Sequence, residues 1–124
     1  MRNSHTMRFL RRLAIFCIVF CALTVLPLLS RAQPTASINI VNNSNREIRH
    51  IYLSPDGGDT WSTNQLGDSV IAPGQSFTVN NSTCEAQQIK VIGEDQDGCF
   101  LSTPVACGGN VTWTITNDTV ADCD

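Results

Sequence analysis

Alternation of apolar and polar residues is the feature of this 124-residue chain that most limits its fold. Val111, Trp113 and Ile115 are separated by threonines, which places all three apolar side chains on one face of an extended strand. Shorter segments of strand character recur along the chain, and no window of a dozen residues carries a sustained helical stripe. They cover residues 37–41, 48–53, 70–71, 76–79, 88–91 and 99–105. The sequence therefore predicts an all-β chain.

Seven short strands separated by turns are typical of two sheets packed face to face. We expect a single Ig-like or transthyretin-like antiparallel β-sandwich of about seven strands, stabilised by disulfides. The apolar residues of the alternating segments predict its core. These residues are Ile38, Ile40, Ile51, Leu53, Phe77, Val79, Ile89, Val91, Leu101, Val111, Trp113 and Ile115.

The first 32 residues differ from the rest and resemble an export signal. Arginines precede an apolar run from Leu13 to Leu29, and Ser30-Arg31-Ala32 puts small residues at the two positions that a signal peptidase reads. We expect residues 1–32 to be a signal peptide and residues 33–124 to form the secreted or periplasmic domain. The alternative is an uncleaved anchor, because the run is at the lower limit of what spans a bilayer.

Removal of this segment leaves an acidic domain. The remaining domain contains all eleven acidic residues of the chain but only three basic ones, Arg46, Arg49 and Lys90. Nucleic acids and anionic membranes bind clustered Lys and Arg, so neither is expected as a partner of the cleaved protein. The self-repelling charge favours a monomer.

Four cysteines follow the export segment: Cys84, Cys99, Cys107 and Cys123. An even number of cysteines in a small exported domain predicts two disulfides. Zinc is the competing use, but these spacings contain no Cys-x-x-Cys pair. We expect no metal and no cofactor.

One hairpin predicts the first disulfide. Asp97-Gly98 is a strong turn signal, and antiparallel partners about a turn have residue numbers with a nearly constant sum. This relation places Cys84 beside residues 107–110 and predicts a bridge to Cys107.

A second expected hairpin predicts the other disulfide. If the chain turns back antiparallel at Gly108-Gly109, Cys99 lies opposite about residue 118, a short distance from Cys123. We therefore expect a bridge between Cys99 and Cys123.

The loop after residue 54 contains Asp56 and Asp59 beside Gly57-Gly58. These carboxylates, with Asp68, could attract a hard cation, but the residue spacing of a calcium-binding loop is absent. A proline followed by aspartate and glycines is typical of a turn. We predict that this loop is a turn.

No catalytic group is supported by a motif. His50 is the only histidine after the export segment, and its place in an alternating segment predicts an exposed strand residue. We expect that the protein is not an enzyme.

Trp61 is predicted to pack inward at one end of the sandwich. The alternative is an exposed aromatic beside Tyr52, which with Asp56 and Asp59 would form the candidate partner-binding residues. The expected function is a non-catalytic binding or accessory module for an unidentified protein or glycan. The second candidate is an inhibitor-like or effector protein that presents the loop Ser54 to Trp61 to an enzyme, and the third is a cation-dependent enzyme or sensor.

A series of short motifs occurs in a fixed order along the chain: Ile51-Tyr52-Leu53-Ser54-Pro55, Asp59-Thr60-Trp61, Leu66-Gly67, Pro73-Gly74, Cys84 and Cys107. In these motifs the chain resembles a family of small exported bacterial β-sandwich proteins of uncharacterised function, with the pattern "IYVSP…D-W-G…LG…PG…C…DG…C". The resemblance implies a fold and a Cys84–Cys107 bridge but no activity. Ser62 replaces the usual glycine after the tryptophan, Ala86-Gln87 replaces Tyr-Asp, and Cys99 and Cys123 are additions.

Overall fold

The computed structural model describes residues 30–123 of the chain. The predicted signal peptide therefore lies outside the described residues, apart from Ser30, Arg31 and Ala32. Within residues 30–123, the chain forms no helix long and apolar enough to cross a membrane.

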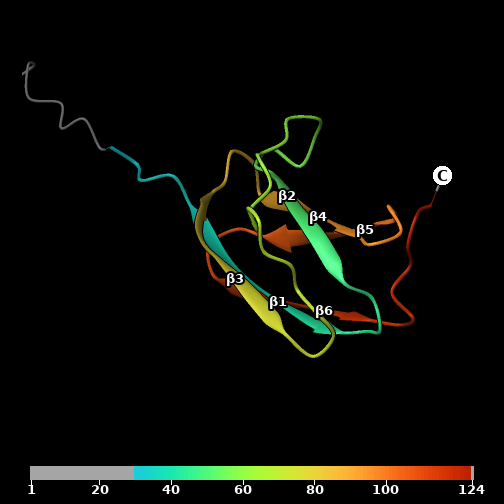
Figure 1. Ribbon diagram of the computed structural model, residues 1–124. Coiled ribbons are helices and arrows are strands. Elements are labelled where there is room, and N and C mark those ends of the chain that lie inside the picture. The colour runs from blue at the N-terminus through green and yellow to red at the C-terminus, as the bar shows by residue number, and fades with distance from the viewer. Residues whose placement is uncertain (1–29, 124) are drawn as a thin grey trace, which may run out of the picture. The chain divides into compact units, whose positions relative to one another are not determined.

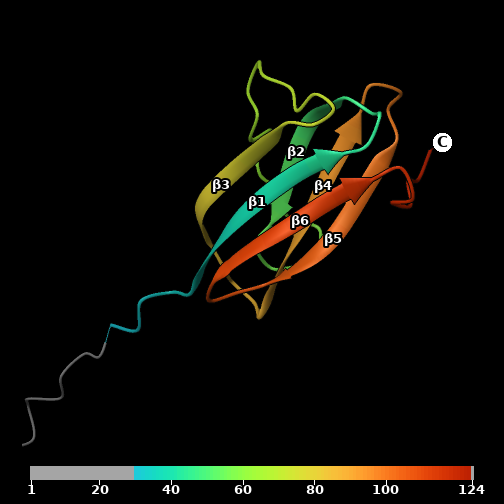
Figure 2. The ribbon, with the colours of Figure 1, turned by 90° about the horizontal axis from the view of Figure 1, so that it is seen from below.

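The described residues form two sheets of three strands each, packed face to face (Figure 1). One sheet has the order β3-β1-β6 and the other has the order β2-β4-β5. Figure 2 shows β3, β1 and β6 side by side in front of the second sheet. The predicted all-β sandwich is therefore confirmed. The strands are β1 (Thr35–Asn43), β2 (Ile48–Ser54), β3 (Ser76–Thr83), β4 (Gln88–Asp95), β5 (Phe100–Ala106) and β6 (Asn110–Thr116).

Two details of the predicted sandwich are wrong. Residues 30–123 form six strands rather than about seven, because residues 70–71 contribute only an isolated bridge between Ile71 and Ile48. The sandwich is also not wholly antiparallel. β6 runs parallel to β1, in a register that joins Ser37 to Asn110 and Asn43 to Thr116.

The expected hairpin between β5 and β6 does not form, because Gly108-Gly109 carries the chain across to the other sheet. The Gly108 nitrogen donates to the Thr35 carbonyl, and the Ser37 nitrogen donates to the Gly109 carbonyl, each at 3.0 Å. Gly108 has a φ of 96°, a conformation that glycine adopts without a steric penalty. The glycine pair thus bonds to β1 instead of returning β6 against β5.

The core lies between the two sheets and contains most of the predicted apolar residues. Phe77 and Val111 are half-buried against it, and the other ten predicted core residues are buried. Alternation explains this success, because the even-numbered positions of β1 and the odd-numbered positions of β6 turn inward. The core also includes residues that were not predicted, namely Ala36, Ile48, Leu66, Ile71, Cys84 and Val105.

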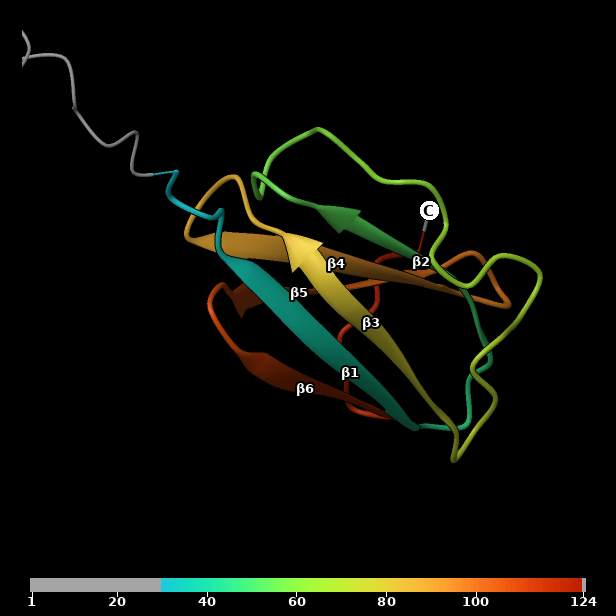
Figure 3. The same cartoon turned by 90° about the vertical axis from the view of Figure 1, so that its left-hand side faces the viewer.

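The long connection between β2 and β3 covers the outer edge of β2. Figure 3 shows this green segment running back alongside β2. The Ser62 nitrogen donates to the Leu53 carbonyl at 2.8 Å, and the Leu53 nitrogen donates to Ser62 Oγ at 3.0 Å. Asn64 Oδ1 accepts from the Ile51 nitrogen at 3.0 Å, and the Gln65 nitrogen donates to the Ile51 carbonyl at 2.8 Å. Backbone and side-chain groups of the loop thus protect an edge strand that would otherwise pair with another chain.

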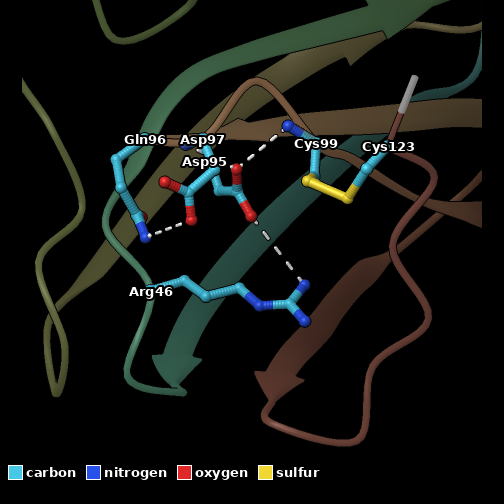
Figure 4. Close-up of a disulfide and its surroundings, with 6 residues drawn as sticks. All are labelled: Arg46, Asp95, Gln96, Asp97, Cys99 and Cys123. Atoms are coloured by element: carbon cyan, nitrogen blue, oxygen red, sulfur yellow. Dashed lines mark hydrogen bonds and ion pairs between the residues drawn. A yellow bond between two sulfur atoms is a disulfide. The ribbon is translucent and has the colours of Figure 1, made fainter.

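Both predicted disulfides are present, Cys84–Cys107 and Cys99–Cys123. Figure 4 shows the second of them. The first agrees with the predicted hairpin, because β4 and β5 pair antiparallel about residues 96–99. The second pairing is correct although the hairpin that predicted it is absent. Its cause is an isolated antiparallel bridge that brings the tail to the start of β5. Two disulfides are typical of a protein in an oxidising compartment.

Candidate functional site

The loop that contains Asp56 is a turn closed by its own side chains. Asp56 Oδ1 accepts from Ser54 Oγ at 2.7 Å and from the Gly58 nitrogen at 2.9 Å. The Gly57 nitrogen donates to the Ser54 carbonyl at 3.1 Å, with Gly57 at a φ of 69°. The Ser54 hydroxyl, followed by the Gly58 amide, lowers the pKa of Asp56 below its ordinary value. The carboxylate is therefore engaged within its own loop.

The neighbouring acid, Asp59, is exposed at the tip of the same loop. Among residues 30–123, no group of three or more His, Cys, Asp or Glu side chains is arranged to hold a metal ion. Asp56 and Asp59 therefore do not belong to a group of this kind.

Trp61 does not pack inward as predicted. Its side chain is 39% exposed, and the Lys90 ammonium lies 5.7 Å from its ring centroid. The physical reason is the edge pairing of the next residue, since Ser62 bonds to Leu53 through its nitrogen and its hydroxyl. This pairing fixes the course of the chain beside β2 and leaves the indole over the outer face of the sheet β2-β4-β5.

Trp61 lines a hollow on that outer face, which we call the aromatic groove. The groove has a volume of about 310 Å³ and is lined by Tyr52, Trp61, Ser62, Ile92 and Phe100. Tyr52 stands directly opposite Ile92 in the pairing of β2 with β4. Phe100 is 43% exposed at the start of β5. Three aromatic rings from two strands and one loop therefore border one apolar hollow.

A second, more polar hollow of about 280 Å³ lies on the same sheet. Lys90 belongs to its lining and also reaches the ring of Trp61, so this lysine stands between the two hollows. The hollow is lined by Gly57, Gln88, Ile89, Lys90, Ser102, Thr103 and Pro104.

His50 extends the aromatic surface along β2. Its ring stacks on Tyr52 with centroids 6.0 Å apart, and its Nδ1 lies 3.0 Å from Glu94 Oε2. The predicted strand position of His50 is confirmed, and its side chain is 41% exposed.

Asp95 belongs to the turn at the end of β4 and not to the aromatic groove. Its buried Oδ1 accepts from the nitrogens of Asp97 and Cys99, at 2.9 and 3.0 Å. Arg46 Nη1 lies 3.9 Å from the other carboxylate oxygen (Figure 4). These contacts account for the acidic stretch at residues 94–98 as the closure of a hairpin.

Sequence reasoning identified Tyr52 and Trp61 but missed Lys90, Ile92 and Phe100. The available signal was alternation in β4, because Val91 points inward and the apolar Ile92 must then lie on the outer face. An outward apolar residue on a central strand, opposite a tyrosine, indicates a surface that is not simply polar.

Comparisons with known proteins yield little. No family model matches the chain, and no curated protein matches it. A solved structure described as the NMR structure of the protein from Eubacterium rectale is similar, with 16% sequence identity and a TM-score of 0.49. The similarity covers 75% of this chain and 87% of that one.

Proposed function

We propose that this protein is a non-catalytic, secreted or periplasmic binding module that holds a protein partner at the aromatic groove. The carrying observation is that Trp61 and Phe100, 39% and 43% exposed, line one hollow together with Tyr52 and Ile92. Exposed tryptophan and tyrosine at the centre of an apolar hollow are the residues on which protein interfaces depend most.

The supply of hydrogen-bonding groups favours a protein partner over a glycan. Ser62 Oγ accepts from the Leu53 nitrogen and from Gln65 Nε2, and it donates to the Thr63 carbonyl. The Ser62 hydroxyl therefore has no hydrogen-bonding capacity left for a ligand. Besides the Tyr52 hydroxyl and the indole N–H of Trp61, the remaining lining is apolar. A sugar needs several polar partners, whereas an apolar side chain of a protein needs none.

The disulfides and the export-type sequence support the location. Cys84–Cys107 and Cys99–Cys123 are stable in an oxidising compartment, and the residues before Gln33 have the composition of a signal peptide.

The inhibitor-like or effector reading is the second candidate, and the exposure of Trp61 favours it. The aspartates contribute less to this reading, because Asp56 binds Ser54 and Gly58 of its own loop. In both candidate functions, Trp61 is the loop residue that contacts the partner.

A titration with a neutral aromatic probe, 3-phenylpropanamide, tests the proposed site. We expect millimolar concentrations to shift the NMR amide signals of Tyr52, Ile92 and Phe100 and the indole signal of Trp61. The variant Trp61→Ala should lose these shifts. Val120→Ala is the matched control, because Val120 is 86% exposed and does not line the groove. Absence of shifts at the groove in the parent protein would reject the proposed function.

A further inference from the structure

Lys90 differs from the other basic residues of the mature domain in its surroundings. Arg46 lies beside Asp95, and Arg49 lies 3.2 Å from Glu47. Within residues 30–123, Lys90 forms no ion pair with a carboxylate and instead rests its ammonium over Trp61. A cation over an indole ring is attracted by the ring's negative face but keeps its charge available to an anion.

The position of Lys90 joins this charge to the aromatic groove. β4 is the central strand of its sheet, and Lys90 stands between Ser54 of β2 and Pro104 of β5. These cross-strand neighbours are uncharged. Lys90 lines the neighbouring hollow and reaches the Trp61 ring, so an apolar side chain seated against Trp61 would lie near an ammonium that has no ion-pair partner within residues 30–123.

We infer that the partner segment carries an Asp or Glu next to the apolar side chain that enters the aromatic groove, and that Lys90 selects this acid. The inference rests on the proposed function and adds the chemistry of the partner. Charge complementarity supports it, because a cation on the rim of an apolar hollow favours partners with an adjacent anion and discriminates against cationic ones.

A side-chain carboxylate fits this surface better than the carboxylate of a chain terminus. Chain termini are captured by successive backbone N–H groups that point at the ligand. The backbone groups of β4 around Lys90 are instead shared between β2 and β5, which pair with it on both sides. The flexible ammonium of Lys90 provides the positive charge that can bind an acid there.

Blocked tetrapeptides with phenylalanine followed by aspartate, asparagine or lysine provide the test. NMR titration should show all groove signals shifting, with a Kd for the aspartate peptide about three- to fivefold below that for the asparagine peptide. The lysine peptide should bind most weakly. Raising the salt concentration should remove the preference, because an exposed charge pair is screened.

Two variants separate Lys90 from the net charge of the protein. Lys90→Gln should abolish the preference for aspartate while leaving the asparagine peptide bound. Arg49→Gln removes the same charge at an exposed site outside the groove and should retain the preference. Loss of the preference in both variants would attribute it to overall charge and overturn the inference.

The remaining outcomes distinguish this inference from the proposed function. Equal binding of the aspartate and asparagine peptides at the groove would overturn the role of Lys90 and leave the groove as a protein-binding site. Failure of every peptide, with groove shifts on adding cellobiose or chitobiose, would overturn both in favour of a glycan site.

Discussion

Phe100 and Asp122 exchange two backbone hydrogen bonds, each 2.8 Å long, and so join the C-terminal tail to the edge of β5. The Cys99–Cys123 disulfide lies immediately beside this pair, and Phe100 is also part of the aromatic groove. The tail therefore supports one wall of the proposed binding site at the edge of the sheet.

Removal of this disulfide should loosen that wall. We expect Cys99→Ser/Cys123→Ser to lower the free energy of unfolding by about 3 kcal/mol, with the size dependent on the model of the unfolded chain. The amide of Phe100 should exchange with solvent faster. Urea unfolding and native-state hydrogen exchange measure the two effects.

The other disulfide is the natural control for that experiment. Cys84 and Cys107 are separated by 23 residues and Cys99 and Cys123 by 24, so loop-closure entropy predicts nearly equal stabilisation. Cys84→Ser/Cys107→Ser should cost as much while sparing the Phe100 amide. Faster exchange at Phe100 in both variants would contradict a local role for the tail.

The two tryptophans should differ in their contribution to stability. Trp113 is 8% exposed within the core, and Trp113→Ala should cost about 3 to 5 kcal/mol. Trp61→Ala should cost about 1 kcal/mol or less, because its ring already lies partly in water. Urea unfolding of both variants measures the difference, and equal losses would place Trp61 among the structural residues.

Asn42 is a buried polar residue whose loss should destabilise the fold. It is fully buried, and its Nδ2 donates to the carbonyls of Arg46 and Ile71 at 2.7 and 2.9 Å. Its Oδ1 accepts from the nitrogen and hydroxyl of Ser44. Asn42→Ala leaves these groups without partners and should cost about 2 to 4 kcal/mol in urea unfolding. Asn39→Ala, on the outer face of the same strand, should cost about 0.5 kcal/mol or less.

The Asp56 turn should weaken in acid. Its pKa is lowered in the folded state by the Ser54 hydroxyl and the Gly58 amide, so the folded state binds the proton less readily than the unfolded chain. The stabilisation is complete above the ordinary value of 3.8 and disappears as the pH falls through the lowered value. Melting temperatures measured from neutral pH into acid should therefore fall less steeply for Asp56→Asn than for the parent.

Asp59→Asn is the control for that series, because Asp59 is exposed and takes no part in the closure of the turn. This variant keeps the Asp56 turn intact and should retain the acid-dependent fall in melting temperature that Asp56 causes. If the melting temperature of Asp56→Asn fell with pH as steeply as that of the parent, Asp56 would not contribute to the pH dependence of stability.

The expected cleavage after Ala32 is tested by N-terminal sequencing of exported protein. The mature chain should begin at Gln33, because small residues occupy both positions read by the peptidase. Recovery of the intact chain in membranes would support the uncleaved anchor.

Alternation along β1, β4 and β6 predicted the sandwich and its core because side-chain direction in a strand depends only on local geometry. The partner of β6 could not be read in this way. Gly108-Gly109 permits either a return beside β5 or a crossing to β1, and its bonds to Thr35 and Ser37 decide between them. The partner of β6 is thus determined by Thr35 and Ser37, which are distant in sequence, and not by the turn itself.

The site was only partly predictable for a similar reason. Trp61 lies in an irregular segment with no period, so its size and apolarity favoured burial. The edge contacts of Ser62 and Asn64 with β2 determine its actual direction. Hydrogen bonds from loop side chains to the backbone of an edge strand follow no periodic pattern in the sequence.

The parallel pairing of β1 with β6 also has a consequence for how the molecule acquires its structure. β1 is the inner strand of its sheet, yet its partners β3 and β6 are made some 40 and 75 residues later. The sheet therefore remains incomplete until residue 116 has been synthesised. Contacts so distant in sequence slow the search for the native state. We therefore expect this chain to spend longer without its complete sheet than a chain whose strands pair with their neighbours in sequence.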